Sequence, residues 1–362
     1  MLGVSIYPEK QNKDEIFAYL QKASSLGIKR IFSCLLSVTK DKEEIKREFK
    51  EINDYAHTLG MVVILDVNPR VFDTLGASYN DLTFFKELSA DGIRLDMGFD
   101  GRKEADMTYN PQDLKIEINI SNDNKYLDNI MSNHPNVKNL IASHNFYPQK
   151  YTGLDLDFFT RITTKFKNFG LTTAAFVTSK HATVGPWPLS HGLCSLELLR
   201  NKSLSAQAKF LYATKLIDDI IIGDAFASDE ELQAFAKVSP HYITFKLKSD
   251  SLIHNTAIEN TILFHEPHFR RGDTNAYSVR STQSRVKYKN EKFTPLITPE
   301  LLKKGDVVIC NDNYGQYKGE LQIILQDQEN VDLGKNKVGE IVEEELILLD
   351  YLKPLERFKF EK

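Results

Sequence analysis

The sequence predicts an α/β protein in which an N-terminal (β/α)8 TIM barrel precedes a smaller all-β domain. Over about the first two-thirds of the chain, short β-branched segments alternate with longer amphipathic segments, the pattern of strand–helix units that build a parallel sheet. After about Val238 the pattern changes to strands separated by turns. The chain has 362 residues, enough for about two domains at roughly 150 residues each. We therefore expect the barrel at residues 1–238 and the second domain at residues 239–362.

The number of strands distinguishes the barrel from a doubly wound sheet. We expect eight, at Gly3–Tyr7, Arg30–Leu35, Val62–Val67, Gly92–Met97, Lys115–Ile120, Asn139–Asn145, Thr172–Thr178 and Ile220–Asp224. A doubly wound dinucleotide-binding sheet would carry GxGxxG after its first strand, where this chain has GVSIYPEK. Both observations favour the barrel.

Amphipathic segments between these strands predict the helices of the barrel. Examples are Lys13–Leu26, Lys42–Leu59, Leu154–Phe169 and Ser205–Ile217. In the second of these, Ile45, Phe49, Ile52 and Ala56 lie on one apolar stripe. Gly27, Gly60 and Gly170 follow three helical segments, at the position where a helix commonly ends in the left-handed conformation.

The second domain is expected to consist of strands and turns. The predicted strands are His241–Leu247, Asn260–Phe264, Ala276–Ser281, Asp306–Cys310, Glu320–Leu325 and Leu346–Leu352. The segments NDNYG and LGKNKVG carry turn signals. Arg270–Asp273 and Thr282–Pro295 are polar, and we expect loops there.

Composition narrows the classes of function. With 41% hydrophobic and 27% charged residues, the chain is a folded protein rather than a disordered one. A net charge of −4 gives no basic field, so we expect no nucleic-acid partner. Three cysteines without CxxC spacing favour a reducing compartment. The N-terminus MLGVSIYPEK has no signal-peptide pattern, so we expect a cytoplasmic protein without a membrane partner.

Polar residues occur where five of the predicted barrel strands end, the face on which TIM-barrel enzymes place their active sites. Because side chains alternate along a strand, each pair of polar residues two positions apart shares one face. The candidates are Asp66 and Asn68, Arg94 and Asp96, Glu117 and Asn119, then His144 and Tyr147, and finally Asp224.

Two interpretations of the carboxylates remain open. Asp66, Arg94 and Glu117 could form a structural salt-bridge ring, with Asp224 capping the last helix of the barrel. Alternatively, two carboxyl groups in one cleft perform glycoside hydrolysis, one as proton donor and the other as nucleophile or base. For that chemistry we expect Asp96 and Glu117 to be the catalytic pair, at comparable depth on adjacent strands. Arg94 would keep Asp96 ionised, and a less polar setting would raise the pKa of Glu117.

The remaining candidates have supporting roles. Asp66 and Asp224 are reserve catalytic carboxylates, and Arg94 is also a substrate-binding candidate. Asn68, Asn119, His144 and Tyr147 are expected to bind sugar hydroxyl, acetamido and lactyl groups. We expect no metal and no cofactor, because the segment His265-Glu266-Pro267-His268 lacks the HExxH spacing and its proline would break the required helix.

Two further segments suggest ligand contacts. The loop 180–188 holds Trp187, the sole tryptophan, between two prolines; its ring suits stacking on a sugar or serves equally well as a packing anchor. Arg270 and Arg280 belong to arginine-containing segments of the second domain. They could bind a phosphate bidentately over the barrel mouth or could be solvated surface residues.

The segments GVSIYPE, FSCLL, ILDVNP, GIRLDMGFDG, SHNFYP and FHEPHFRRGDTNAYSVRST together resemble a bacterial family once labelled "outer surface protein" and now understood as 6-phospho-N-acetylmuramidases. The resemblance covers essentially the whole chain. It implies a TIM barrel joined to a cyclophilin-like β-barrel. It also implies intracellular hydrolysis of the β-1,4 bond between N-acetylmuramic acid 6-phosphate and N-acetylglucosamine, in peptidoglycan recycling.

The expected partner is therefore a phosphorylated amino-sugar disaccharide, and the sequence is also compatible with a homodimer. Two alternatives remain. One is another TIM-barrel sugar-phosphate enzyme, an isomerase or epimerase with a carboxylate base. The other is a non-catalytic carbohydrate- or peptide-binding protein, which would bind ligand without turnover.

Overall fold

The computed structural model describes residues 1–35, 41–182, 184–189 and 191–362. Thr183, in the loop around Trp187, and Leu36, in the FSCLL segment, lie outside the described residues. The chain divides into two compact units, Met1–Leu211 with Lys215–Lys237, and Tyr212–Thr214 with Val238–Lys362. None of the described helices is long and apolar enough to cross a membrane.

The first unit is a closed barrel of eight parallel strands, in the order β1 to β8. Its strands are β1 (Leu2–Ile6), β2 (Arg30–Cys34), β3 (Val62–Val67), β4 (Gly92–Leu95), β5 (Lys115–Asn119), β6 (Leu140–Ser143), β7 (Thr172–Val177) and β8 (Asp219–Ile222). Each overlaps one of the predicted segments, so the predicted TIM barrel is confirmed.

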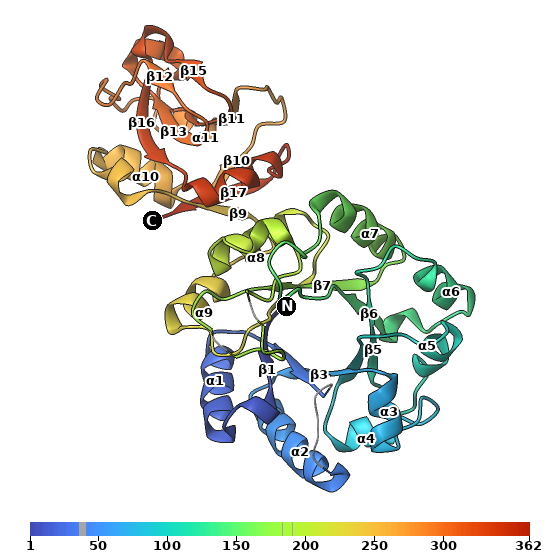
Figure 1. Cartoon of the computed structure of the whole chain (residues 1–362). Helices are drawn as coiled ribbons and strands as arrows, with labels where there is room; N and C mark the ends of the chain where they lie inside the picture. The colour runs from blue at the N-terminus through green and yellow to red at the C-terminus, as the bar shows by residue number, and fades with distance from the viewer. Residues whose placement is uncertain (36–40, 183, 190) are drawn as a thin grey trace. The chain divides into compact units, whose positions relative to one another are not determined.

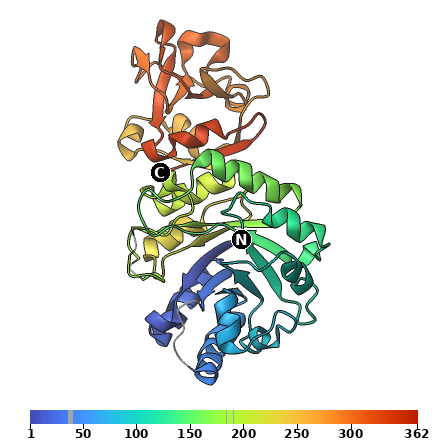
Figure 2. The same ribbon diagram turned by 45° about the vertical axis from the view of Figure 1, so that its right-hand side comes forward.

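Helices lie outside this ring of strands (Figures 1 and 2). They are α1 (Lys13–Ser25), α2 (Lys42–Thr58), α3 (Pro69–Leu75), α4 (Thr83–Glu87), α5 (Arg102–Met107), α6 (Tyr126–Ser132), α7 (Leu156–Asn168), α8 (Leu204–Ala213) and α9 (Asp229–Ala236). Helix α2 shows how the sequence specifies them. Asp41 caps its N-terminus by accepting from Glu43 and Glu44, and the predicted apolar stripe is buried. Gly60, just past its end, has φ of 68°.

The barrel interior has an apolar side and a charged side. Residues from β1, β2, β7 and β8 and the segments after them form one apolar cluster, made of Tyr7, Phe32, Cys34, Ala174, Phe176, Ile221 and Ala225. Across β3, β4 and β5, by contrast, Asp66, Arg94 and Glu117 are neighbours in the strand register. A pocket above this interior is therefore apolar on one side and charged on the other.

The second unit consists mainly of small sheets. The strands are β9 (Ile243–Lys246), β10 (His268–Phe269), β11 (Ser278–Ser281), β12 (Leu301–Leu302), β13 (Asp306–Cys310), β14 (Leu321–Ile324), β15 (Gln328–Glu329), β16 (Lys335–Glu340) and β17 (Arg357–Glu361). They form sheets of order β10-β17-β9, β11-β14-β13-β16 and β12-β15, antiparallel except for the β17–β9 pair.

Several predictions for this unit were wrong. The predicted strand Asn260–Phe264 lies in helix α10 (Ala257–His265), which a capping box of Thr256 and Glu259 begins. A short apolar run does not distinguish strand from helix by periodicity, and the capping box was the signal that decides it.

Other errors concern the ends of the same unit. The predicted strand Leu346–Leu352 coincides largely with a 3-10 segment, Glu343–Asp350, and the predicted loop Thr282–Pro295 contains helix α11 (Gln283–Lys287). The turn signal LGKNKVG overlaps β16, which pairs with β13 through a register shift. Strand β17 was not predicted.

Candidate active site

A pocket of about 210 Å³ opens at the carboxyl end of the barrel strands. Its lining comes from the ends of β2, β3, β4 and β6 and from the loop after β7, and consists of Cys34, Asp66, Arg94, Asp96, Asn145, Phe146, Pro186 and Trp187. Four of these, Asp66, Arg94, Asp96 and Trp187, were candidates from the sequence. Cys34, Asn145, Phe146 and Pro186 were not.

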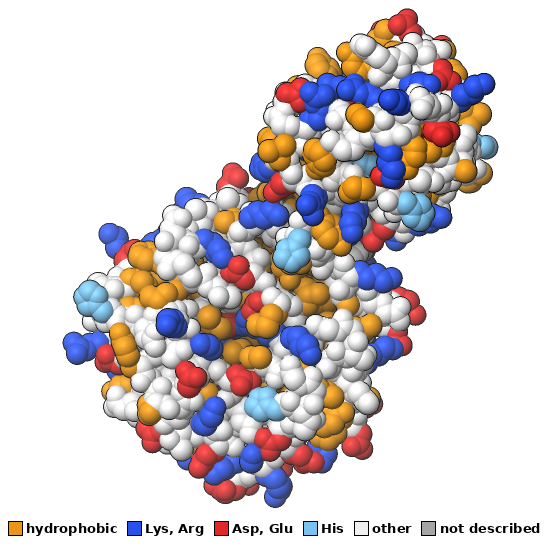
Figure 3. Space-filling view, turned by 180° about the vertical axis from the view of Figure 1, so that it is seen from behind, with side chains coloured by type: hydrophobic (Ala, Val, Ile, Leu, Met, Phe, Trp, Pro, Cys, Tyr) orange, Lys and Arg blue, Asp and Glu red, His pale blue; other side chains and the backbone are white. Residues whose placement is uncertain are grey.

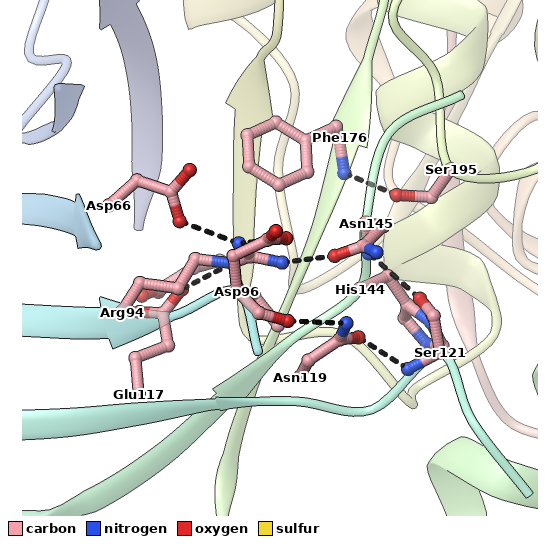
Figure 4. Close-up of polar contacts among 12 residues, drawn as sticks. Asp66, Arg94, Asp96, Glu117, Asn119, Ser121, His144, Asn145, Phe176 and Ser195 are labelled. Carbon is pink, nitrogen blue, oxygen red and sulfur yellow. Dashed lines mark hydrogen bonds and ion pairs between the residues drawn. The ribbon is translucent and has the colours of Figure 1, made fainter. Parts of the chain in front are cut away.

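The buried guanidinium of Arg94 organises the charged side of this pocket (Figure 4). Its Nη1 donates to Asp66 at 2.7 Å and to Asp96 at 3.3 Å. Its Nε donates to the hydroxyl of Ser143 at 2.8 Å, and its Nη2 donates to Asn145. Because its nitrogens are all engaged by protein acceptors, Arg94 has a fixed orientation.

Asp66 and Asp96 are the two carboxyl groups that face the pocket. Both present Oδ1 to the same nitrogen of Arg94, so these oxygens lie no more than about 6 Å apart. Their environments differ. Asp66 is buried, whereas the side chain of Asp96 is 34% exposed. Burial raises the pKa of Asp66 to about 7, although the Arg94 charge acts in the opposite direction.

Glu117 does not face the pocket, contrary to the expectation that it pairs with Asp96. Arg94 is in register with Glu117, so Asp96 lies level with Asn119 and Glu117 lies one layer deeper. Glu117 is fully buried there. Its Oε2 binds Nη2 of Arg30, and its Oε1 lies 3.9 Å from Nε of Arg94. Arg30 also binds Asp219 at 2.6 Å, so Glu117 belongs to a charge network across the barrel interior.

The expected salt-bridge ring is therefore present in part. Asp66, Arg94 and Glu117 do lie on neighbouring strands around one guanidinium. The other half of that interpretation is wrong, because Ser228, not Asp224, caps the last helix of the barrel, α9.

His144 points away from the pocket, and its neighbour Asn145 points into it. Ser143 is in register with Asn119 and its hydroxyl oxygen accepts from Nε of Arg94, so it faces the barrel interior. Alternation then sends Asn145 to the same side and His144 to the other. The buried His144 ring stacks on Phe159 of α7 at 4.4 Å and bonds Thr163 of the same helix. His144 therefore does not line this pocket, where a sugar contact was expected, and strand alternation was the signal for Asn145.

The three other sugar-binding candidates lie near strand ends, in backbone contacts. Asn68 is the N-cap of α3 and accepts from Val71. Asn119 donates to the backbone oxygen of Asp96 at 3.3 Å and accepts from Ser121, so it positions the Asp96 segment. Tyr147 is partly buried, and its backbone oxygen accepts from Arg200.

An apolar wall faces the carboxylates. The Phe146 ring packs edge-on against Phe176 and Phe32 at 5.1 and 6.1 Å. Trp187 also lines the pocket and keeps 46% of its surface exposed. Lys10, after β1, donates to the backbone oxygens of Pro186 and Gly185 at 2.6 and 3.2 Å and so holds the loop that carries the tryptophan.

Asp224 belongs to a second pocket, of about 520 Å³, at the ends of β7 and β8. Its Oδ2 accepts from the hydroxyl of Thr178 at 2.6 Å and from the amide of Ser179 at 3.1 Å. Burial raises the pKa of Asp224 to about 6, and these hydrogen bonds limit the rise.

The arginine candidates of the second unit contact other residues of that unit. Arg280 forms a bidentate pair with the buried Glu320 at 2.6 and 2.9 Å. Arg270 donates through Nη1 to the backbone oxygen of Leu352 at 2.6 Å. Both guanidinium groups therefore have structural contacts inside their own unit.

Comparison with known proteins places the chain in a family. Residues 2–237 match the family model "6-phospho-N-acetylmuramidase, N-terminal", and residues 243–361 match the corresponding C-terminal model. The chain belongs to the 6-phospho-N-acetylmuramidase family. It is accordingly a glycosidase, which sets aside the alternative of a non-catalytic binding protein.

Solved structures share the fold of the chain over its whole length. A crystal structure of an uncharacterised B. cereus protein is 48% identical, with a TM-score of 0.91, covering 100% of this chain and 99% of that one. A conserved Enterococcus faecalis protein of unknown function is 24% identical with a TM-score of 0.76, covering 100% and 96%, and shows the shared fold. No curated protein matches the chain.

The separation of the Asp66 and Asp96 oxygens can be compared with the two carboxyl arrangements found in glycosidases. Glycosidases that form a covalent intermediate hold their two carboxyl groups roughly 5 to 5.5 Å apart, and those that activate water directly hold them roughly 6.5 to 9.5 Å apart. A separation of at most about 6 Å fits the first arrangement.

Proposed function

We propose that this protein hydrolyses the β-1,4 bond between N-acetylmuramic acid 6-phosphate and N-acetylglucosamine, in the cytoplasm, as a step of peptidoglycan recycling. The family membership supports the substrate, and the pairing of Asp66 and Asp96 on one Arg94 nitrogen supports the chemistry. The small sheets of the second unit are compatible with the cyclophilin-like domain that the resemblance implies.

In this proposal Asp66 is the acid and Asp96 the nucleophile. Asp66, which is buried and has a pKa raised to about 7, gives its proton to the bridging oxygen as the bond from C1 breaks. The more exposed Asp96 carboxylate forms a bond to C1, with its charge balanced by Arg94. Asp66 then takes a proton from water, whose oxygen displaces Asp96 from C1. The product keeps the β configuration.

The pocket walls suit a sugar ring. Trp187 and Phe146 offer apolar surfaces to one face of the ring, and Asn145, which accepts from Arg94, lines the same pocket as a hydrogen-bonding group. Hydrophobic contact on one side and charged groups on the other would orient C1 toward Asp96.

Purified protein with the synthetic disaccharide tests this function directly. We expect release of N-acetylglucosamine without added metal or nucleotide and no effect of a chelator. The first-formed sugar phosphate should be the β anomer by proton NMR, because two displacements restore the configuration. An isomerase or epimerase would release no second sugar, and an α anomer would exclude the covalent pathway.

Three matched amide variants test the catalytic pair. Asp66→Asn and Asp96→Asn should each lower kcat by about 10³-fold or more, since each removes a proton donor or a nucleophile. Glu117→Gln is the control, because its carboxylate lies below the pocket, and it should reduce kcat only a few-fold. Folding of each variant is checked by circular dichroism. A folded Glu117→Gln protein as inactive as Asp96→Asn would restore Glu117 to the mechanism.

A further inference from the structure

We infer that the second barrel pocket, at the carboxyl ends of β7 and β8, binds the 6-phosphate of the substrate through Lys150 and Lys180. This inference rests on the proposed function and replaces Arg270 and Arg280 as the phosphate ligands. The pocket is lined by Lys150, Thr178, Ser179, Lys180, Ala182, His191, Gly192, Arg200, Asn201 and Asp224.

The rim of this pocket is cationic and open. Lys150, Lys180 and His191 are exposed. Within the described parts of the chain, neither lysine ammonium has a hydrogen bond or an ion pair. The Nδ1 of His191 accepts from the backbone amide of Lys150 at 3.3 Å, which leaves its Nε2 to carry a proton and donate. A phosphate dianion can therefore bind these groups without breaking hydrogen bonds or ion pairs that they already make.

The floor of the pocket is rigid. The hydroxyl of Thr178 donates to Asp224 and accepts from the amide of Leu193 at 2.9 Å. Gly192 has φ of 103°, and a Cβ there would lie 2.9 Å from the Thr178 hydroxyl, so a side chain would not fit between the two walls. Arg200 holds the same wall through the backbone oxygens of Tyr147 and Gly192 at 2.9 and 2.8 Å.

The phosphate pocket adjoins the catalytic pocket. Residues that follow β7 line both pockets, with Thr178, Ser179, Lys180 and Ala182 in one and Pro186 and Trp187 in the other. Tyr7 connects their bases, since it packs in the cluster with Cys34 and donates to the backbone oxygen of Gly223, next to Asp224. The 6-phosphate belongs to the sugar whose C1 is cleaved, so it must bind beside the carboxylate pair.

The position also fits the architecture. In TIM barrels, phosphate groups frequently bind at the loops after the seventh and eighth strands, the place of this pocket. Arg280, by contrast, already forms a bidentate pair with the buried Glu320, and releasing it to bind phosphate would leave that carboxylate with Arg285 at 3.2 Å as its remaining ion-pair partner among the described residues.

Binding of two non-hydrolysable sugars tests the site without turnover. By calorimetry, N-acetylglucosamine 6-phosphate should bind wild-type protein at least about tenfold more tightly than N-acetylglucosamine. The double variant Lys150→Ala/Lys180→Ala should lose this preference, and Lys150→Arg/Lys180→Arg should keep most of it. Lys86→Ala, an exposed lysine of α4, is the charge-matched control and should bind like wild type.

A second binding experiment distinguishes recognition of the phosphate from recognition of the lactyl carboxylate. Unphosphorylated N-acetylmuramic acid should bind the double alanine variant and wild type equally. If its affinity falls instead while that of N-acetylglucosamine 6-phosphate is unchanged, the lysines bind the carboxylate and the inference is wrong. Loss of phosphate preference in Arg270→Ala or Arg280→Ala, with both lysine variants normal, would also overturn it.

The rate of hydrolysis tests the phosphate site independently of the binding measurements. The ratio of kcat/KM for the phosphorylated over the unphosphorylated disaccharide should fall by roughly 100-fold in the double alanine variant. Absence of any hydrolysis by wild type would overturn the proposed function while the binding result still decided the phosphate site.

Discussion

At the scale of single residues, one guanidinium makes two similar carboxyl groups different. Arg94 contacts both Asp66 and Asp96, yet Asp66 is buried among barrel side chains and Asp96 reaches solvent. Desolvation disfavours the charged form of Asp66 more than the nearby cation favours it, so the pKa of Asp66 is raised to about 7. A proton donor needs a raised pKa, whereas a nucleophile must stay ionised, so the two carboxyl groups must lie in different environments.

The pH profile should report this difference. As pH rises through about 7, Asp66 loses the proton that it must donate, so kcat/KM for the disaccharide should fall about tenfold per pH unit above that point. A 4-nitrophenyl glycoside of the same sugar phosphate needs little acid assistance and should lack this limb. Activity toward the disaccharide that stays constant up to pH 9 would exclude Asp66 as the acid.

Stability provides a check on the same residue. The folded-state pKa of Asp66 lies above its unfolded value of about 3.9, so the folded protein holds the extra proton between about pH 4 and 7. This residue therefore lowers the free energy of unfolding as pH rises through that window. Urea denaturation of Asp66→Asn should show a weaker loss of stability from pH 5 to 8 than wild type. An unchanged pH dependence would contradict the raised pKa.

At the scale of elements, the loop after β7 connects chemistry and binding. It carries Trp187 into the catalytic pocket, contributes Lys180 to the second pocket and is held by Lys10 from the β1 end. Because Lys10 contacts only the loop backbone there, its effect on the reaction would pass through loop position.

Variants of this loop should raise KM more than they lower kcat. Trp187→Ala removes the aromatic surface and should raise KM about tenfold, while Trp187→Phe should keep most of the affinity. Lys10→Ala should raise KM several-fold, because the loop loses two anchors. Since Trp187 is the sole tryptophan, its fluorescence on ligand addition checks the same contact. Unchanged fluorescence and KM would place the sugar elsewhere.

Strands and helices were predicted correctly where a single local sequence pattern was enough to identify them. Strand β3 has its predicted bounds, and the buried stripe of α2 follows its helical period. Within the site, alternation was sufficient to place Asn145 inside and His144 outside, although it was not applied to β6. Helix α10 differs from the predicted strand because a short apolar run is compatible with either structure, and the capping box of Thr256 and Glu259 favours the helix.

At the scale of the whole barrel, a buried charge network links distant strands. Arg30 on β2 binds Glu117 on β5 and Asp219 on β8, and Asp219 also binds the N-terminal ammonium at 2.5 Å. Three strands of the closed ring thus share one guanidinium below the pocket. Removing it would leave two buried carboxylates with fewer partners, which is the costly way to break such a network.

Arg30→Met should therefore lower the free energy of unfolding of the barrel by about 3 to 5 kcal/mol. Urea denaturation followed by Trp187 fluorescence measures this, because the tryptophan belongs to the barrel unit. Lys13→Met, which breaks the exposed pair with Glu51, is the control and should leave stability nearly unchanged. Equal stability of Arg30→Met and wild type would mean that the network contributes little.

The sequence by itself determined the barrel, its eight strands, the change to a sheet-rich second unit and the set of polar residues at the strand ends. These features follow from the periodicity of hydrophobic residues in helices and from their alternation in strands. Both patterns can be found in the sequence because they involve residues that are close together along the chain. Only the tertiary structure decided which carboxyl groups meet. The register between β4 and β5 sets Glu117 one layer below Asp96, whereas Asp66, in register with Arg94, lines the pocket and shares one Arg94 nitrogen with Asp96. Register is a relation between strands separated in the chain, so no local pattern specifies it.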